Sequence, residues 1–423
     1  MFDCINLSSC RVSILASNLL AAESSLAVGA PQAERKEQLP AYSAVGLVTG
    51  VAERRLKEDI RAAARRLGFQ LCGFARADSV PHAAFVRQWI DGGNAGGMRY
   101  LERSLAQRLD PRHALPAVRS VITVGYRYLP PPVPPVDWQR EMRGRIAAYA
   151  LGADYHRTVA ERLRALAAQI AELRPGAVLR PAVDTSAVLE REWAALGGMG
   201  WFGKNTNILH NENGSYFFLG ELLTDLALDP DPPIADHCGT CTRCLDLCPT
   251  EALQPGYVLD ARLCISYLTI EHRGTIPVPL RAKLGNWIFG CDVCQEVCPW
   301  NEKLVRERGA PSDLLPYLPD LARLSEQQFR NRFRGSAIRR ATREGLVRNV
   351  MVALGNTRNP GAVSVLAAAL LDDPSAVVRQ HAAWALGRIG DRGARRGLDA
   401  ARRREADIAA RAAIDAAIEE GAQ

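Results

Sequence analysis

Residues 238–249 read CGTCTRCLDLCP, and this stretch decides how the middle of the chain folds. Its cysteines follow the spacing Cys-x2-Cys-x2-Cys-x3-Cys-Pro, which is the bacterial ferredoxin pattern for an iron–sulfur cluster. A shorter run at residues 291–299, CDVCQEVCP, also ends in Cys-Pro, and Cys264 lies between the two runs. Eight of the 11 cysteines therefore lie between residues 238 and 298, which indicates a module that transfers single electrons.

The two runs together predict two four-iron clusters that exchange ligands. In the ferredoxin pattern, the fourth cysteine of each run ligates the other cluster. The second run lacks its third cysteine, and Cys264 is the nearby residue that can replace it. Cluster one is expected to be held by Cys238, Cys241, Cys244 and Cys298. Cluster two is expected to be held by Cys248, Cys264, Cys291 and Cys294.

Other uses of these cysteines fit the spacing less well. A zinc ribbon requires two well-separated Cys-x2-Cys pairs, whereas three cysteines here follow one another at x2 spacing. One cluster with additional thiols is a further alternative. The Cys-x3-Cys-x2-Cys spacing of radical-SAM enzymes does not occur in the sequence, which excludes that class.

Length and composition limit the class of protein. A chain of 423 residues, 48% hydrophobic and 23% charged, is expected to form two or three globular domains. Its apolar runs are too short to span a bilayer, so we expect no membrane partner. Clustered, odd-numbered cysteines indicate a reducing compartment, and we predict a cytoplasmic monomer. Residues 1–48 are predicted to be a poorly structured extension, with a weak signal peptide as the alternative; Cys4, Cys10 and Cys72 receive no role.

Residues 49–233 alternate predicted helices and strands, which is typical of an α/β or α+β domain. Periodicity predicts helices at 53–67, 81–91, 98–108, 153–173 and 188–196, and strands at 70–75, 120–128 and 177–183. Two further strands, 205–210 and 215–223, flank Asn213-Gly214, so we expect a hairpin there. Five prolines in residues 130–135 predict a loop. The proline-rich segment 229–233 marks a boundary before the cysteine module at 234–302.

Residues 303–423 form a third predicted domain, which is helical and rich in alanine. Leu354-Gly355, Leu386-Gly387 and Ile418 recur with a period of 32 residues, which indicates paired helices of a short HEAT-like repeat. This tail carries 21 Lys and Arg against 14 Asp and Glu, whereas residues 1–302 carry 32 of each. Arginine suits bidentate contact with phosphate, so the tail is a candidate RNA-binding surface, and a solvated helical face is the alternative. The densest group comprises Arg330, Arg332, Arg334, Arg339, Arg340, Arg343 and Arg348.

Three polar, glycine-rich stretches precede the cysteines: residues 149–156, 183–191 and 198–205. Asp184 follows a predicted strand and precedes a helix, so it could cap that helix or act as a catalytic acid with a pKa raised by burial. On spacing alone the cap is favoured, and His156 fits a packed or surface histidine better than a metal ligand. Glycines 198, 200 and 203 allow close approach of a bulky group but do not match a Rossmann or P-loop spacing.

The motifs as a set resemble one family. They are YALGADYH (149–156), VDTSAVLER (183–191), GMGWFGKNTNIL (198–209), CPTEAL (248–253), CISYLTIEHRG (264–274) and NWIFGCDVCQEVCPWN (286–301). In this order they resemble the epoxyqueuosine reductases, cobalamin-dependent enzymes that complete queuosine in tRNA. The resemblance runs from about Glu53 to the C-terminus. It implies an α/β (α+β) corrinoid-binding domain, a ferredoxin-like module with two [4Fe-4S] clusters, and a C-terminal HEAT-like repeat domain.

The resemblance also implies cofactors, partners and site residues. It implies base-off cob(II)alamin beside one cluster, a tRNA carrying epoxyqueuosine as substrate, and a flavodoxin- or ferredoxin-type electron donor. Asp184 is the implied proton donor, and residues 269–274 are expected to approach the tRNA. The implied corrinoid contacts are Arg108, Tyr149, His156, Asp184, Lys204, Asn205 and Asp292.

The implied reaction removes the epoxide oxygen as water, using electrons that the clusters pass to cobalt. Burial is expected to raise the pKa of Asp184 and keep its carboxyl protonated near neutral pH. The Asp-x-His-x-x-Gly signature of histidine-ligated cobalamin proteins is incomplete, because Val159 stands where that signature has glycine. We therefore predict that His156 does not ligate cobalt.

Three rival functions have discriminating features. A reductive dehalogenase-like corrinoid reductase acting on a small molecule usually has a twin-arginine signal and lacks a basic helical tail. An electron-transfer module that serves a partner would not need the long domain before the cysteines. A repeat-based tRNA adaptor with structural clusters would have clusters that resist chemical reduction.

Overall fold

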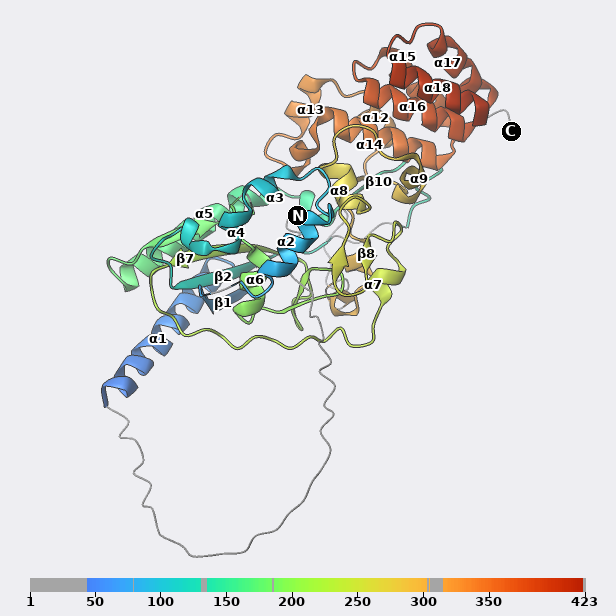
Figure 1. Cartoon of the computed structure of the whole chain (residues 1–423). Coiled ribbons are helices and arrows are strands. Elements are labelled where there is room, and N and C mark those ends of the chain that lie inside the picture. Colours follow the sequence, from blue (N-terminus) through green and yellow to red (C-terminus); the bar gives the residue numbers. More distant parts are fainter. Residues whose placement is uncertain are drawn as a thin grey trace, which may run out of the picture.

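A four-stranded antiparallel sheet forms the centre of the N-terminal half (Figure 1). Its order is β1-β2-β7-β4, and the strands are β1 (Leu71–Arg76), β2 (Ser120–Arg127), β7 (Phe217–Thr224) and β4 (Leu179–Ala182). Every neighbouring pair is antiparallel, so this domain is α+β and does not have the parallel sheet of an α/β fold. The computed structural model describes residues 44–78, 80–130, 135–184, 186–302, 304 and 315–420.

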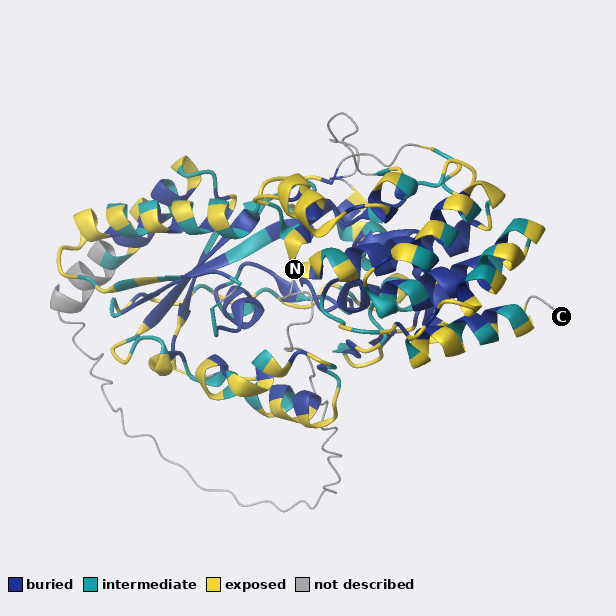
Figure 2. Cartoon of the chain, turned by 90° about the horizontal axis from the view of Figure 1, so that it is seen from above, coloured by how far each residue is buried: buried dark blue, intermediate teal, exposed yellow. Residues whose placement is uncertain are grey.

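Helices cover both faces of this sheet. The long helices α1 (Ala44–Arg66) and α5 (Tyr155–Leu173) bury Ile60, Leu163 and Leu166 against one face. Helix α6 (Glu190–Leu196) packs on the other through Trp193. Figure 2 shows the long helices on this sheet with exposed outer sides and buried inner sides, which is the pattern that amphipathic periodicity predicts. Helix α6, in contrast, is buried or half-buried along its whole length.

Two predictions for this half need correction, and a third lies mostly outside the described residues. The helix predicted at 98–108 is two helices, α3 (Arg99–Arg103) and α4 (Leu105–Leu109), because the chain turns at Ser104. Helix α1 begins at Ala44, inside the segment predicted as an unstructured extension; the rest of that segment lies outside the described residues. The structure describes only Pro130 and Pro135 of the predicted proline loop.

The hairpin predicted at Asn213-Gly214 is also wrong. The strand before the turn, β6 (Ile208–Leu209), pairs with β5 (Trp201–Phe202), and β7 pairs with β2 and β4. Only a single bridge between His210 and Gly214 crosses the turn. Strand β7 lies inside the sheet, so both of its edges are already occupied and the turn signal cannot add a partner.

The cysteine module is built from short elements. They are α7 (Arg243–Asp246), β8 (Leu253–Gln254), β9 (Val258–Leu259), α8 (Ile265–Ile270), α9 (Val278–Arg281), β10 (Trp287–Phe289) and α10 (Val293–Glu296). Strand β10 pairs in parallel with β3 (Arg145–Ile146) of the N-terminal half. This pairing joins the module to the segment that leads into residues 149–156.

A two-layer helical repeat follows the module. One layer stacks α14 (Thr342–Thr357), α16 (Ala376–Ile389) and α18 (Ile408–Glu420), and the other contains α15 (Val363–Asp372) and α17 (Arg392–Arg402). A Cβ atom on Gly355 would lie 2.8 Å from Ala385, and one on Gly387 would lie 3.0 Å from Ala417. The 32-residue period therefore marks the points where successive helices of the first layer cross.

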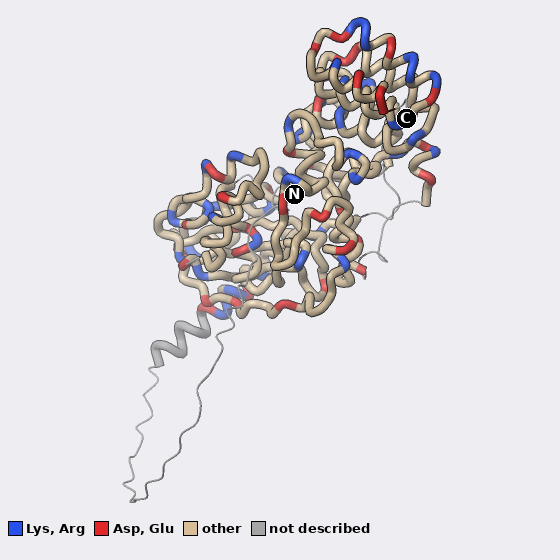
Figure 3. Tube along the Cα trace, turned by 45° about the vertical axis from the view of Figure 1, so that its right-hand side comes forward, with Lys and Arg blue, Asp and Glu red and all other residues tan. Residues whose placement is uncertain are grey.

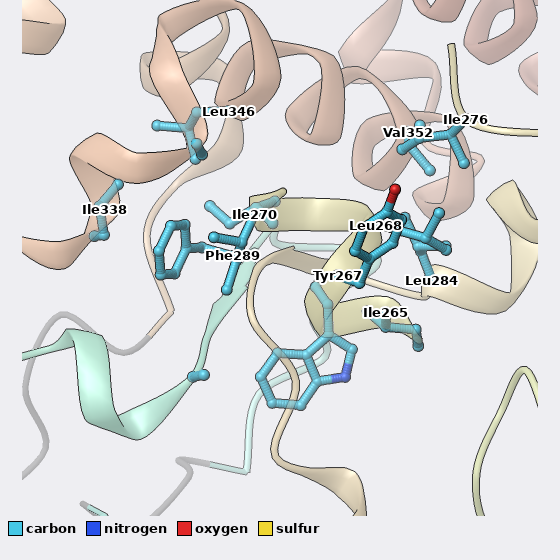
Figure 4. Packing of buried hydrophobic residues seen from close by; sticks show 14 of the residues in the cluster. Ile265, Tyr267, Leu268, Ile270, Ile276, Leu284, Phe289, Ile338, Leu346 and Val352 are labelled. Carbon is cyan, nitrogen blue, oxygen red and sulfur yellow. The ribbon is translucent and has the colours of Figure 1, made fainter. Parts of the chain in front are cut away.

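The repeat is joined to the module through a mixed apolar and polar interface. Ile265, Leu268 and Ile270 of α8 lie beneath α14, as Figure 4 shows. Within this interface, the Arg348 guanidinium donates to the carbonyls of Leu268 (2.6 Å), His272 and Gly274 (each 2.9 Å). The side chain of Asn349 donates to two more carbonyls of the module. The predicted RNA contact of Arg348 is therefore wrong, because the residue is only 1% exposed.

The charge of the tail is divided unevenly between its parts (Figure 3). Residues 303–358 carry 12 Lys and Arg against 5 Asp and Glu, whereas residues 359–423 carry 9 of each. The basic excess thus lies in the part of the tail that adjoins the module, and the outer repeat is balanced. Among the described residues, no helix combines the length and apolar character that a membrane crossing requires.

Candidate active site and cluster cavities

A cavity of about 440 Å³ lies between the sheet domain and the repeat. One wall comes from the sheet domain and carries Arg108, Tyr149, Tyr155, His156 and Asp184. The facing wall carries Tyr100 and Arg103 of α3 together with Ala337 and Arg340, which precede α14. Four of the predicted corrinoid contacts, Arg108, Tyr149, His156 and Asp184, therefore line one cavity.

Asp184 is fixed at this cavity by two hydrogen-bonding side chains. Its carboxylate accepts a 2.6 Å hydrogen bond from the Tyr155 hydroxyl, and Nε2 of His156 lies 2.5 Å away. The other ring nitrogen of His156 lies 2.6 Å from Asp154 Oδ1. Helix α5 positions this group, because Asp154 caps its first turn by accepting from the His156 backbone N–H. Asp184 caps no helix, since α6 begins at Glu190 after Leu189.

The raised pKa expected for Asp184 stays a prediction. Burial acts to raise that pKa, whereas hydrogen bonds from His156 and Tyr155 act to lower it. Burial likewise disfavours the charged form of His156, yet Asp184 and Asp154 raise its pKa. The two residues thus form a coupled pair in which the proton resides mainly on the imidazole.

Arg108 holds the segment that carries Asp184. Its guanidinium donates to the Val188 carbonyl (3.1 Å) and to the Ser104 hydroxyl (3.0 Å), and the residue is buried. Val188 lies four positions after Asp184, in the segment that connects β4 to α6. Arg108 therefore positions this segment in addition to lining the cavity.

The facing wall is basic. Arg340 forms an ion pair with Glu271, with 2.5 Å between Nε and Oε1, and its guanidinium lies 5.8 Å from the centre of the Tyr100 ring. Arg103 is exposed on the same side. Arg273, in the segment expected to approach tRNA, is exposed and donates to the Arg340 carbonyl. This wall presents exposed arginines next to the buried Asp184.

The other arginines of the predicted RNA-binding group differ in exposure. Arg343 is paired with Asp373 and is largely buried, so it is not available to RNA. Arg330 is exposed and paired with Glu326. The remaining members, Arg332, Arg334 and Arg339, are exposed.

The eight cysteines of the module line two separate cavities. Cavity one, of about 240 Å³, is lined by Cys238, Cys241, Cys244 and Cys298. Cavity two is lined by Cys248, Cys264, Cys291 and Cys294. The grouping is the one that the exchanged-ligand pattern predicts, with Cys264 in the second set.

Burial raises the pKa of several thiols that line these cavities. Burial raises the pKa of Cys244 to about 12, and the neighbouring cysteines add to this rise. Burial also raises the pKa of Cys298 to about 11 and that of Cys291 well above its ordinary value. Iron binding must therefore displace the protons of these thiols.

The remaining predicted corrinoid contacts lie at the cluster cavities. Lys204 Nζ donates to the carbonyls of Gly239 (2.7 Å) and Cys241 (2.9 Å). Asn205 donates to the Cys294 carbonyl (3.1 Å) and lines both cavities. Neither residue lines the Asp184 cavity, so the structure does not bring them together with the other predicted contacts.

Asp292 connects the second cavity to the sheet domain. Its carboxylate accepts a 2.6 Å hydrogen bond from the Ala148 N–H, next to Tyr149. Burial raises the pKa of Asp292 to about 7. Gln295 also lines both cavity two and a smaller cavity that contains Tyr149 and Tyr155. Of the two cysteine cavities, cavity two is therefore the one that Gln295, Tyr149 and Tyr155 connect to the Asp184 site.

Several site residues were not predicted from the sequence. Tyr155 stands inside the DYH motif, but its hydrogen bond to Asp184 depends on how α5 packs. Tyr100 and Arg103 lie far from the quoted motifs and carry no sequence signal of their own. Trp201 and Trp300 pack beside cavity one with their rings 5.0 Å apart, and their positions within two of the motifs are the only hint.

Comparisons with known proteins agree with this architecture. Family models match a 4Fe-4S double cluster binding domain at residues 237–301, epoxyqueuosine reductase QueG at 108–185 and HEAT repeats at 335–418. These matches define the class as an iron–sulfur protein with a C-terminal helical repeat.

Individual relatives are more specific. Epoxyqueuosine reductase of Pseudomonas aeruginosa is 42% identical over 80% of this chain and 95% of its own length. The crystal structure of an epoxyqueuosine reductase with an epoxyqueuosine-modified tRNA-Tyr stem loop superposes with a TM-score of 0.81 at 32% identity, covering 88% of this chain and 100% of the other. The chain belongs to the epoxyqueuosine reductase family. A shorter relative from Cellulophaga algicola is 39% identical, and the match covers 95% of it but 69% of this chain.

Proposed function

We propose that this protein reduces epoxyqueuosine to queuosine at the wobble position of tRNA. The observation that carries the proposal is the Asp184 cavity, where a buried acid–imidazole pair faces exposed arginines and adjoins a four-cysteine cavity. The reaction consumes two electrons and two protons, converts the epoxide to an alkene and releases one water. It therefore needs an electron source, a proton source and an RNA-binding surface in one place.

The two cysteine cavities are the electron source. Each surrounds a space with four thiols, the ligand number of a [4Fe-4S] cluster, and thiolates are the soft ligands that iron–sulfur clusters require. Cluster one takes Cys238, Cys241, Cys244 and Cys298, and cluster two takes Cys248, Cys264, Cys291 and Cys294. The electrons come from a one-electron carrier of the flavodoxin or ferredoxin type.

The Asp184 cavity fits a corrinoid. Tyr149 and Tyr155 line both this cavity and the smaller cavity that shares Gln295 with cavity two. Arg108, Tyr149, His156 and Asp184 are the residues that would contact the bound group. When bound, the corrinoid supplies a strongly reducing, nucleophilic cobalt centre. Both ring nitrogens of His156 lie within 2.6 Å of carboxylate oxygens, which supports the prediction that this side chain would not bind the metal of the group.

The coupled pair of Asp184 and His156 delivers a proton to the departing epoxide oxygen. The proton resides on His156 in the resting chain, and Asp184 transfers it as the carbon–oxygen bond breaks. Tyr155 holds the carboxylate in place, and Asp154 orients the imidazole through its other nitrogen. Arg108 keeps the Asp184 segment closed over the cavity.

The arginine wall binds the RNA around the reacting nucleotide. Arg103, Arg273, Arg334, Arg339 and Arg340 are exposed near the cavity or on the segment that leads to it. Their contacts are to phosphate and do not depend on base sequence, since the bidentate guanidinium recognises the backbone. We further propose that the protein acts as a monomer in the cytoplasm.

The test is anaerobic turnover by the full chain. Protein reconstituted with iron and sulfide is incubated with cobalamin, a chemical reductant and tRNA carrying epoxyqueuosine, and the nucleosides are analysed by mass spectrometry. The proposal predicts loss of epoxyqueuosine and an equal gain of queuosine, both dependent on cobalamin. Unchanged epoxyqueuosine with fully loaded clusters and bound cobalamin would refute it.

A further inference from the structure

The two cluster cavities have different electrostatic surroundings. Cavity one is lined by the basic side chains of Lys204 and Arg243 and by no carboxylate. Cavity two is lined by no charged side chain at all. The nearest ionisable group there is the buried Asp292, adjacent to Cys291 and hydrogen-bonded to Ala148. Positive charge therefore gathers around one cavity only.

Lys204 is held rigidly against the first cysteine run. Its ammonium group donates to the carbonyls of Gly239 and Cys241 at 2.7 and 2.9 Å, so the charge is fixed within the loop that surrounds cavity one. One residue thus places a fixed positive charge beside this cavity.

Trp201 adds a candidate donor on the same side. The residue is 3% exposed, and its Nε1 atom has no hydrogen-bond partner among the residues that the structure describes. The ring packs with Cys238 and Cys298 beside cavity one, so this buried N–H is a candidate donor to the cluster sulfurs. Trp300 and His237 pack edge-on against the Trp201 ring at 5.0 and 4.9 Å and fix its orientation.

Solvent exposure differs in the same sense. The residues next to the cysteines of cavity one, including Gly239, Thr240 and Thr242, are exposed. Next to the cysteines of cavity two, Ile265, Asp292 and Gln295 are buried, whereas Leu247 and Pro249 beside Cys248 are exposed.

Two acidic residues near cavity one are exposed. Glu302 forms a 2.9 Å ion pair with Arg243 and offsets part of its charge, and Asp236 accepts a hydrogen bond from the Cys238 N–H. The main fixed positive charge at cavity one is therefore that of Lys204.

We propose that the two clusters have different reduction potentials, with cluster one higher, and that Lys204, Arg243 and Trp201 create the difference. Net positive charge, donors to the cluster sulfurs and solvent exposure each stabilise the more negative reduced form of a cluster. All three act on cluster one. Cluster one is then reduced first by the external one-electron carrier and retains the electron. Cluster two, which adjoins the Asp184 cavity, is the stronger reductant. The inference rests on the proposed division of the cysteines.

The test is an anaerobic potentiometric titration of the reconstituted full chain, monitored by electron paramagnetic resonance. We expect two separate reduction steps. Lys204→Met and Trp201→Phe should each move the higher step to lower potential and leave the lower step in place. Arg243→Gln, at an exposed position, should move it in the same direction by less. The matched control is Lys283→Met in the same module, where an exposed lysine pairs with Glu251 and lines neither cavity.

Two outcomes would overturn the inference. One is a single potential for both clusters in the wild-type protein. The other is that the variants have full iron content but their higher reduction potential is unchanged, or that the lower potential moves instead. If Lys204→Met does not bind its full iron content, the test rests on whether the higher reduction potential moves in Arg243→Gln. Queuosine formation by the same wild-type sample separates this failure from failure of the proposed function, because turnover does not depend on the order of the two potentials.

Discussion

The two walls of the Asp184 cavity differ in how far their side chains are buried and fixed, and this suits them to different roles. The wall from the sheet domain is buried, and its functional side chains are fixed by short hydrogen bonds: the Asp184 side chain is 6% exposed and is held by Tyr155 and His156. The wall formed by α3 and the repeat is exposed, and Arg340 there has a half-exposed side chain. Proton transfer needs preorganised groups shielded from water, whereas phosphate contact tolerates mobile, hydrated charges.

The difference predicts that the two walls affect different kinetic quantities. Changes in the buried wall should lower kcat, because its contacts act on the reacting bonds. Changes in the exposed wall should raise KM for tRNA and alter its salt dependence, because its contacts act on binding.

The largest effect is expected for Cys264→Ala, which tests the electron source behind the buried wall. Cavity two would lose one of its four thiols, so cluster two should not assemble while cluster one remains. Iron content should fall from about eight to about four atoms per chain, and queuosine formation should cease. Cys72→Ala, at a half-buried thiol of the sheet domain that lines neither cavity, is the matched control. Unchanged iron content in Cys264→Ala would remove this residue from the ligand set.

Arg348→Met tests whether Arg348 stabilises the fold while its exposed neighbours remain available to bind RNA. The change leaves three buried carbonyls without their donor, which should cost about 3 kcal/mol or more in the free energy of unfolding. Arg339→Met, at an exposed position nearby, should cost under about 0.5 kcal/mol. Denaturation of both variants provides the comparison, and equal losses would contradict the division.

His156→Gln should lower kcat by about tenfold or more and change its pH dependence. In the wild-type protein, the pKa of His156 is raised, so the proton of the pair is present below that pKa and is lost as pH rises through it. We expect kcat to fall at alkaline pH, and the fall to move to lower pH in His156→Gln, since Asp184 alone must then hold the proton. The pH–rate profile at saturating tRNA measures this; identical profiles would exclude His156 from proton delivery.

The smallest effect is expected for Arg334→Gln combined with Arg339→Gln. KM for tRNA should rise a few-fold, and the slope of log affinity against log salt should become shallower by about 2, since two phosphate contacts are lost. The control is Arg157→Gln with Arg66→Gln, two arginines on the outer surfaces of α5 and α1. An unchanged salt slope would show that Arg334 and Arg339 belong to an ordinary solvated surface and do not contact phosphate.

The spacing of residues in the sequence predicted those features of the fold and site that depend on local chemistry. The exchanged-ligand pattern groups the cysteines as the two cavities do, and the 32-residue period places Gly355 and Gly387 at helix crossings. The family resemblance implied Arg108, Tyr149, His156 and Asp184 as corrinoid contacts, and these four residues line one cavity. These features recur at fixed positions because the chemistry or the packing requires them.

Properties that arise from long-range contacts could not be predicted. The hydrogen bonds at Asp184 come from Tyr155 and His156, which α5 brings to it from 29 and 28 positions away. Arg348 looked like its exposed neighbours in the sequence, and only the packing of α14 on α8 buries it. Asn213-Gly214 carries a strong local turn signal, but the central position of β7 in the sheet overrides it.

The central claim is that Asp184 delivers the proton in a cavity whose opposite wall binds RNA, and single-turnover kinetics of Asp184→Asn test it most directly. Asparagine keeps the shape but cannot donate an acidic proton, so the rate of queuosine formation should fall by about 10²- to 10⁴-fold. Iron content, cobalamin binding and tRNA affinity should match the wild-type protein. A single-turnover rate near the wild-type value, with the clusters and cobalamin in place, would contradict the account.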